Sequence, residues 1–253
     1  MRLNIFKTTN IASVKEVFLK ILFIGTLFFW VNMQGQYASG SGTEENPYLI
    51  SNSSELVTLS QTNADWGKHF KLTSSIDMNG VSFSPIGNGT TAFSGSFIGN
   101  FHTISNLTIT PPADLLDGTG LFGSASGAIS DLGISNISIV KAGYSRVAAF
   151  VGILEGSGSV KKCFSTGGTI DVGNGGWAGS IVGAMFSGST RTVEDCYSST
   201  TIDGSWGCGG IVGLTRGDHV IDRVAFYGEV TGGNAIVSIQ NDPANSQKNG
   251  VPP

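Results

Sequence analysis

The chain has 253 residues, a net charge of −4 and 37 glycines, which is enough length for one large domain and about twice the usual glycine share of roughly 7 %. Residues 1–36 hold four of the 14 basic and one of the 18 acidic residues, so the remainder carries a net charge of −7. Such an acidic chain argues against a nucleic-acid partner, because nucleic-acid binding requires a basic surface.

Residues 1–36 differ from the rest in having the pattern of a secretory signal peptide. Basic residues at positions 2, 7, 15 and 20 precede an apolar run from Ile21 to Val31. This run is too short for a membrane-spanning helix, which needs about 20 apolar residues. We predict cleavage after Gly35 or Ala38 and therefore a secreted or outer-surface protein with no membrane span after signal removal. A retained amphipathic or membrane anchor is the alternative.

A four-residue motif then recurs along the chain: a small residue, two apolar residues and a glycine. Its five copies are Ser96–Gly99, Gly120–Gly123, Ala149–Gly152, Ser180–Gly183 and Gly210–Gly213. Their last glycines lie 24, 29, 31 and 30 residues apart, and a weaker copy at 235–238 follows. A period of this size indicates one supersecondary unit stacked on its neighbours.

A second pattern follows each motif, with apolar or small residues at i, i+3 and i+5. The sets are Ile104, Leu107 and Ile109; Ile129, Leu132 and Ile134; Val160, Cys163 and Ser165; Val193, Cys196 and Ser198; and Ile221, Val224 and Phe226. Positions i+3 and i+5 share one face of a strand, and a bend between i and i+3 would turn position i inward as well. We expect the middle residues, Leu107, Leu132, Cys163, Cys196 and Val224, to stack in one interior ladder.

Both patterns favour an all-β fold, a right-handed parallel β-helix (solenoid) in which successive coils pair strand to strand. Glycine, serine, threonine and asparagine fill the gaps between the apolar positions and suit tight corners. Propeller blades need longer repeats of about 40 to 50 residues, and leucine-rich repeats need a consensus that is missing here. A two-sheet sandwich would not produce the same spacing in every unit.

Two of the three cysteines, Cys163 and Cys196, take the ladder position that Leu or Val holds in other repeats. We therefore expect buried thiols that act as small apolar side chains and form no structural disulfide. The odd cysteine count and the lack of a Cys-x-x-Cys pair argue against a zinc site.

The motifs resemble those of bacterial secreted GLUG-repeat proteins, named for their Gly-Leu-x-Gly motif, which are adhesin-like. Residues 120–230 resemble the repeats, and residues 41–110 resemble the segment that precedes them. The resemblance implies strands at 46–50, 69–72 and 76–78, and a short helix at 54–59. Ile98 and Phe101 stand where the family has Asp and Gly, so the first coil is expected to pack differently.

These observations divide the chain into four parts. We predict a signal peptide at 1–36, a helix-containing N-terminal cap with the first strands at 37–95, and GLUG-type β-helix coils at 96–240. Residues 241–253 have the composition of a linker. Because an open coil end exposes unpaired backbone groups, the sequence suggests a truncated or incomplete chain.

The sequence contains no complete catalytic motif, and we predict no catalytic residues, no metal site and no cofactor. His69, His102 and His219 lie in no His-Glu-x-x-His motif, and no Gly-x-Ser-x-Gly elbow or phosphate-binding loop occurs. We expect a structural role for His102 and a solvated turn around His219.

Charged residues at matching repeat positions form two expected columns on the outer surface, Lys161, Glu194 and Asp222, and Lys162, Asp195 and Arg223. In the second column the sign alternates at every step, which favours pairing between neighbouring strands. Together with Arg191, these residues are also the candidates for the alternative function, a polysaccharide lyase or glycoside hydrolase, or the non-catalytic region of a larger secreted enzyme.

Aromatic residues in the glycine-rich corners are the best binding candidates. Trp177 and Trp206 lie six and seven residues before the ends of adjacent motifs, and Tyr144 lies eight before the end of an earlier one. Aromatic rings at such positions could stack on sugar rings or on a partner, or could cap corners of the core. We therefore predict a secreted or cell-surface structural or adhesive module that binds a glycan or protein surface without catalysis.

Overall fold

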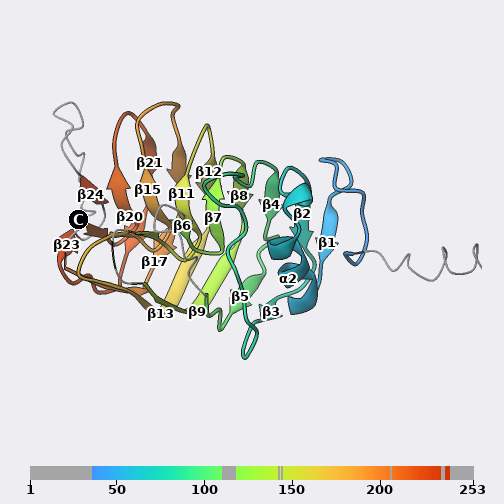
Figure 1. Cartoon of the computed structure of the whole chain (residues 1–253), viewed down its shortest axis with the longest axis horizontal. Helices are drawn as coiled ribbons and strands as arrows, with labels where there is room; N and C mark the ends of the chain where they lie inside the picture. Colours follow the sequence, from blue (N-terminus) through green and yellow to red (C-terminus); the bar gives the residue numbers. More distant parts are fainter. Residues whose placement is uncertain are drawn as a thin grey trace, which may run out of the picture. The chain divides into compact units, whose positions relative to one another are not determined.

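The computed structural model describes residues 36–109, 118–141, 143, 145–205, 207–234 and 237–239. Apart from Gln36, these residues belong to one compact unit that begins at Tyr37. Its strands stack as a parallel β-helix (Figure 1), which confirms the predicted fold class. The predicted signal peptide, apart from Gln36, and the predicted linker at 241–253 lie outside the described residues.

From Ser96 onward, each coil in the described part of the chain passes through four sheets, which we number 1 to 4 in chain order. The strands before Ser96 belong to sheets 1 and 2. Sheet 1 contains β1 (Tyr48–Ile50), β2 (His69–Leu72), β4 (Ser96–Ile98), β8 (Ala128–Ser130), β12 (Ser159–Lys161), β16 (Thr192–Glu194) and β21 (Val220–Asp222). Sheet 2 contains β3 (Ile76–Asp77), β5 (Thr103–Ser105), β9 (Gly133–Val140), β13 (Phe164–Gly173), β17 (Tyr197–Ser198), β18 (Thr201–Gly204) and β22 (Ala225–Phe226).

The other two sheets are shorter. Sheet 3 contains β6 (Gly118–Thr119), β10 (Arg146–Val147), β14 (Trp177–Ala178), β19 (Cys208–Gly209) and β23 (Gly233–Asn234). Sheet 4 contains β7 (Phe122–Ala125), β11 (Val151–Leu154), β15 (Val182–Met185), β20 (Val212–Thr215) and β24 (Val237–Ile239). The paired strands within each sheet run parallel, as stacked coils require.

The segment before the first full coil contains helix α2 (Ser53–Gln61) and the 3₁₀ turn η1 (Asn63–Asp65), between β1 and β2. Asn52 caps α2 by accepting a hydrogen bond from the Glu55 amide at 3.1 Å, and Glu55 accepts one from the Ser51 amide. Leu56 and Leu59 are fully buried in the core. The predicted strands and short helix of this segment are confirmed.

The corner between sheets 1 and 2 is made by one residue in the left-handed conformation. Asp131, Lys162, Asp195 and Arg223 hold this position in four successive coils, with φ between 49° and 55°. Such a residue reverses the direction of the next side chain, so the apolar residues on both sides of it point inward. This is the bend that the spacing i, i+3, i+5 predicts.

The interior ladder next to this corner contains four of the five residues expected in it. The register of β9, β13, β17 and β22 aligns Leu132, Cys163, Cys196 and Val224. The prediction is wrong for Leu107, because Ile104 pairs with Ile134 rather than Ile129. Leu107 follows a second corner and belongs one ladder further along.

That second corner, within sheet 2, is held by an asparagine ladder. Asn106 and Asn136 both have φ of 56°, and Gly167 takes the same place in the next coil with φ of 65°. Asn136 donates to Asn106 at 2.7 Å, and Asn106 donates to Asp77 at 2.8 Å. The bond from Asn106 holds the pKa of the Asp77 carboxyl below its ordinary value.

The motif glycines allow two layers of backbone to lie in direct contact. They occupy one register position of sheet 4, at Gly123, Gly152, Gly183 and Gly213. A Cβ on Gly152 would lie 2.3 Å from the Thr119 amide nitrogen, and one on Gly183 would lie 2.6 Å from that of Val147. Thr119 and Val147 belong to sheet 3, which therefore covers sheet 4 and leaves all four residues of β7, β11, β15 and β20 buried.

The first copy of the motif is not equivalent to the other four. Ser96–Gly99 overlaps β4 of sheet 1, whereas Ile86 pairs with Phe122 and so precedes the true counterpart of the motif glycine, Gly87. The turn that follows β4 also differs from the corners of the later coils, which have one left-handed residue each. Asn100 and Phe101 form a left-handed turn with φ of 53° and 64°, and the Phe101 side chain is 80 % exposed.

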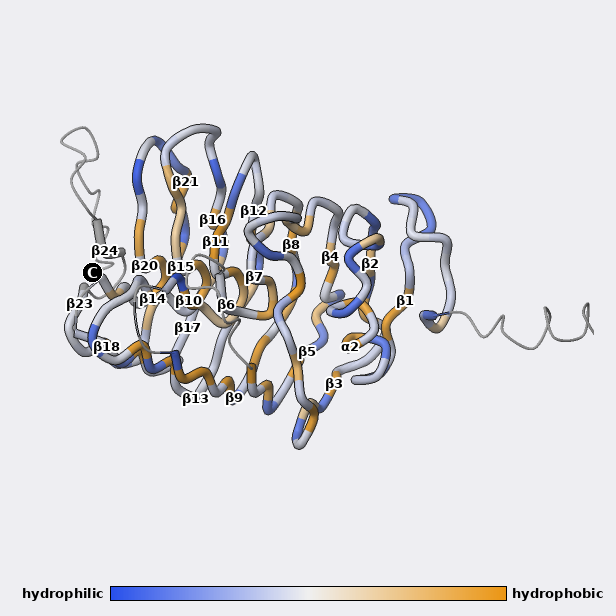
Figure 2. Tube along the Cα trace, in the orientation of Figure 1, coloured by the Kyte–Doolittle hydropathy of each residue, from blue (hydrophilic) through white to orange (hydrophobic). Residues whose placement is uncertain are grey.

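The core changes in character along the stack of coils. A chain of aromatic contacts fills the first coils through Tyr37, Tyr48, Phe70, Phe93, Phe122 and Phe97. Later coils are filled mainly by aliphatic residues, together with Phe150 and the cysteines. Figure 2 shows hydrophobic and hydrophilic residues alternating along β9, the pattern of a strand with one face in the core. No helix among the described residues is long and apolar enough to cross a membrane.

Candidate functional site

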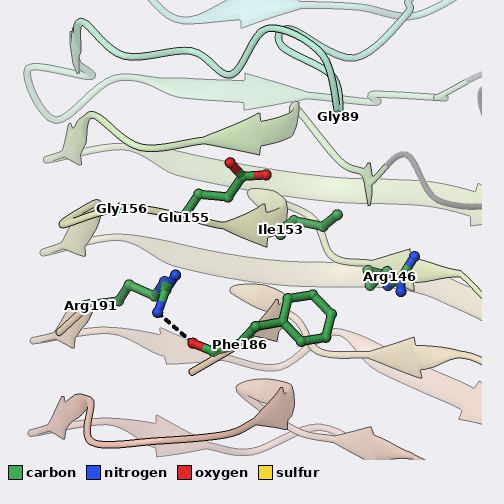
Figure 3. A pocket seen from close by; sticks show the side chains of 7 residues that line it. All are labelled: Gly89, Arg146, Ile153, Glu155, Gly156, Phe186 and Arg191. Carbon is green, nitrogen blue, oxygen red and sulfur yellow. Dashed lines mark hydrogen bonds between the residues drawn. The ribbon is translucent and has the colours of Figure 1, made fainter. Parts of the chain in front are cut away.

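A hollow of about 430 Å³ opens beside sheets 3 and 4. It is lined by Gly89, Arg146, Ile153, Glu155, Gly156, Phe186 and Arg191 (Figure 3). These residues come from several coils and are brought together by strand register. Two arginines, one carboxylate and two apolar side chains make up its chemistry.

Arg146 projects from β10 between two aromatic rings. Its guanidinium carbon lies 5.3 Å from the centre of the Trp177 ring and 5.4 Å from that of Phe186. Both distances are within the range of cation–π attraction. Burial, with a smaller contribution from the charge of Arg216, lowers the pKa of Arg146, which nevertheless stays a cation. The two rings therefore hold a planar cation in a defined orientation.

One wall of the hollow is built by the residue that follows each strand of sheet 4. Leu154, Met185 and Thr215 are in register, so Glu155, Phe186 and Arg216 form the next column. The Glu155 carboxylate accepts a hydrogen bond from the Ser124 hydroxyl at 2.5 Å. This column thus places an acid, an aromatic ring and a base on three adjacent coils.

Arg191 closes the other side of the hollow and is only 7 % exposed. Its Nη1 donates to the carbonyl oxygens of Phe186 and Ser189, at 2.5 and 2.8 Å (Figure 3 marks the first). Its Nε is buried and has no hydrogen-bond partner among the described residues. Burial lowers the pKa of Arg191, and the charge of Glu155 opposes that shift.

Of the three aromatic residues predicted to bind a ligand, the structure describes one, Trp177. Trp177 lies on β14, where the register pairs it with Arg146 and places Gly207 on its other side. Its ring contacts Arg146, so it adjoins the hollow. Tyr144 and Trp206 lie outside the described residues. The binding role of all three residues stays a prediction.

The histidines lie apart from one another, and two of them make local hydrogen bonds. His69 Nδ1 lies 2.8 Å from the Ser96 hydroxyl. His219 Nε2 lies 2.8 Å from the Arg216 carbonyl oxygen, and its Nδ1 accepts from the Arg191 amide at 3.4 Å. Burial lowers the pKa of His219, which favours the neutral ring. Among the described residues, no group of three or more His, Cys, Asp or Glu side chains is placed to hold a metal ion.

The charged columns occur where they were predicted. Lys161, Glu194 and Asp222 are in register on sheet 1, and Lys161 forms an ion pair with Glu194 at 3.0 Å. In the next column Arg223 binds Asp195 and also reaches Glu194 and Asp222. These side chains are solvated and pair with one another, as the alternating signs indicate.

This network should make stability depend on pH. Hydrogen bonds from Arg223 hold the pKa values of Glu194 and Asp195 below their ordinary values of 4.5 and 3.8. A lowered carboxyl pKa stabilises the fold above the unfolded-state value, and this contribution is lost as the pH falls through the folded-state value. We expect Arg223→Gln to lower the urea midpoint at pH 7 and to leave it unchanged near pH 2. An equal loss at both pH values would contradict this account.

The buried cysteines match the prediction. Cys163 and Cys196 are 1 % and 2 % exposed and sit in adjacent coils as free thiols. Burial, followed by the neighbouring Cys196, raises the pKa of the Cys163 thiol well above its ordinary value. Burial also raises the pKa of Cys208 to about 11. The Cys163 and Cys208 thiols are therefore held in the unreactive protonated form. The hydrogen bond with Cys163 lowers the pKa of Cys196 instead.

Sequence reasoning missed Arg146, Glu155 and Phe186 as site residues, although the spacing contained a signal. Arg146 lies six residues before Gly152, the same offset at which Trp177 precedes Gly183. Glu155 and Phe186 each follow their motif glycine by three residues. A search for functional side chains at fixed offsets from the motif would have found all three.

Comparison with known proteins gives no family model that matches this chain. Halomucin of Haloquadratum walsbyi is 32 % identical over 182 residues, which are 68 % of this chain and 2 % of halomucin. A "putative Gly-rich membrane protein" of Evansella cellulosilytica is 32 % identical over 131 residues, 48 % of this chain and 14 % of that protein. The chain thus spans a small part of the length of either relative.

A solved structure has the same fold. The crystal structure of a "putative immunoglobulin A1 protease" from Bacteroides ovatus matches with a TM-score of 0.64 and 23 % identity, over 83 % of this chain and 66 % of that one. At this level of identity the similarity shows the β-helix fold alone.

Proposed function

We propose that this chain is a secreted or cell-surface β-helix module of GLUG type that binds an extracellular glycan or protein surface and catalyses no reaction. The signal-like segment at 1–36 supports an extracellular location. Halomucin and a Gly-rich membrane protein, by their names, are compatible with a surface role. A stack of coils provides a stiff frame on which a binding face can be fixed.

The observation that carries the proposal is the cluster of Arg146, Trp177 and Phe186 beside the hollow. A cation held between two aromatic rings combines charge, hydrogen-bond donors and apolar surface in one place. Trp177 is the binding residue we favour, and Tyr144 and Trp206 are the other binding residues that the sequence predicts. Such a cluster suits binding, because binding requires these contacts and no proton transfer.

The alternative, a polysaccharide lyase or hydrolase, would use charges on the outer face as acid and base. The candidate groups Lys161, Glu194, Asp195 and Arg223 are instead engaged with each other in ion pairs. Those pairs lower the pKa values of Glu194 and Asp195 and so move them further from neutral pH. A carboxylate with a lowered pKa is a weak general base. Arg191 does not belong to this network and instead lines the hollow.

Replacing Trp177 with Ala should weaken binding on a glycan or host-surface array while the fold is kept. Loss of the ring removes one of the two aromatic side chains that orient Arg146. We expect about a fivefold loss of affinity from a cation–π and stacking contribution of about 1 kcal/mol. Phe101→Ala, at an 80 % exposed aromatic in another corner, is the matched control and should bind like the wild type.

Far-ultraviolet circular dichroism of both variants checks the fold. Equal binding by Trp177→Ala and the wild type would contradict the proposed surface. Release of reducing or unsaturated sugar ends by the wild type would instead support the enzyme alternative.

A further inference from the structure

We propose that the hollow beside sheets 3 and 4 recognises a carboxylate-bearing sugar, an acidic hexose unit within an extracellular glycan. This inference rests on the proposed function and specifies the class of its ligand. The chemistry that would recognise the ligand is the pair of arginines, the single carboxylate and the apolar wall of the hollow.

The charges of the residues that line the hollow do not cancel. Arg146 and Arg191 face one acidic lining residue, Glu155, so the hollow has an excess of positive charge. Arg191 is 7 % exposed and forms no ion pair with any described residue. The charge of Glu155 offsets only part of the cost of burying Arg191, and an anion in the hollow would offset the remainder.

Both guanidinium groups are held in fixed orientations. Arg191 is fixed by two carbonyl oxygens, and Arg146 is fixed between the rings of Trp177 and Phe186. A guanidinium that is already oriented loses little freedom when it binds, and its planar fork matches the two oxygens of a carboxylate. The hollow is therefore organised for a planar anion before any ligand arrives.

The rest of the lining favours a sugar over a small inorganic anion. Ile153 and Phe186 provide apolar surface of the kind against which a sugar ring packs. Glu155 accepts the Ser124 hydrogen bond through Oε1, so its second carboxylate oxygen, Oε2, can accept one from a sugar hydroxyl. The negative charge of Glu155 also disfavours densely sulfated chains, whose several charges would meet it.

The size of the hollow suits one sugar unit. A hollow of about 430 Å³ falls within the range of small-ligand sites, which is about 300 to 1,000 Å³. Two of its lining residues, Gly89 and Gly156, are exposed to solvent. A glycan chain could therefore enter with one unit bound and its neighbours outside.

Isothermal titration calorimetry of the purified protein with three probes tests this inference. The probes are a trimer of galacturonate, the same trimer as its methyl ester, and a sulfated galactose trimer. We expect the galacturonate trimer to bind at least about tenfold more tightly than its ester, because the ester lacks the charge-assisted bonds to arginine. We expect the sulfated trimer to bind more weakly than galacturonate.

Two variants that remove the same charge locate the site. Arg146→Gln should weaken binding of the galacturonate trimer by about tenfold or more, whereas Arg223→Gln, in the distant charged column, should leave it within about twofold. Arg146→Lys keeps the charge without the planar fork and should give an intermediate loss. Circular dichroism identifies any variant that fails to fold, and Arg146→Lys then carries the test.

The outcomes separate this inference from the proposed function. Equal affinity for the trimer and its ester, or equal loss in Arg146→Gln and Arg223→Gln, overturns the acidic-sugar site while array binding still supports a surface module. Tighter binding of the sulfated trimer also overturns it. Absence of binding to every array glycan and protein surface overturns the proposed function itself, and this inference with it.

Discussion

Replacing Leu132 with Asp is expected to lower the free energy of unfolding by about 4 kcal/mol or more. Leu132 is 1 % exposed and lies between the corner residue Asp131 and strand β9. The substitution removes a fully packed side chain and buries a carboxylate next to Cys163, where no cation is available in the described core. Urea denaturation followed by circular dichroism measures the effect.

Ser138→Asp is the matched control, because it adds the same carboxylate at an exposed position of the same strand. A surface substitution of this kind usually changes stability by less than about 0.5 kcal/mol. If both variants unfolded at the wild-type midpoint, the ladder of Leu132, Cys163, Cys196 and Val224 would not be the core of these coils.

Replacing Gly183 with Ala is expected to cost about 3 kcal/mol or more, although only one methyl group is added. The new Cβ would lie 2.6 Å from both the Gly152 carbonyl oxygen and the Val147 amide nitrogen. Both are backbone atoms, so strand β10 would have to move away from β15. The φ of Gly183 lies outside the left-handed region, so the cost arises from contact and not from backbone strain.

Gly67→Ala is the matched control for this variant. A Cβ there would meet only the Ser94 hydroxyl, at 3.5 Å, and stability should change by less than about 0.5 kcal/mol. Thermal denaturation of the two variants in parallel gives the comparison. A Gly183→Ala variant as stable as the wild type would show that the motif glycine has another purpose than close packing of sheets 3 and 4.

The fold could be predicted because a solenoid repeats one environment. Gly152, Gly183 and Gly213 each meet the backbone of sheet 3 in the same way, so the same residue is required at the same point of every coil. The corner residues Lys162 and Asp195 likewise repeat one conformation. Periodic constraints of this kind leave periodic residues in the sequence.

The first copy of the motif was assigned to the wrong sheet, because strands of sheet 1 and sheet 4 can contain similar residues. Ser96–Gly99 has the letters of the motif but runs through sheet 1, where Phe97 pairs with Ile129. The shorter spacing of 24 residues after it, compared with 29 to 31 for the others, was the available signal. The left-handed turn at Asn100 and Phe101 then shifts the pattern that follows.

The candidate site was found only in part, because it is assembled across coils. Trp177 stood out as an aromatic in a glycine-rich corner, and it does contact the hollow through Arg146. Arg191 was grouped with the exposed charges, yet it is buried beneath Phe186. Burial of a charged side chain depends on the loop that folds over it, which the repeat spacing does not specify.

The central claim is that this module binds its ligand and leaves it unchanged. Calorimetric titration with the glycan that binds best on the array, followed by mass spectrometry of the recovered ligand after prolonged incubation, tests this claim most directly. We predict a saturable binding isotherm and recovery of the intact glycan. Recovery of shortened chains with new reducing or unsaturated ends, formed in proportion to the protein added, would contradict it.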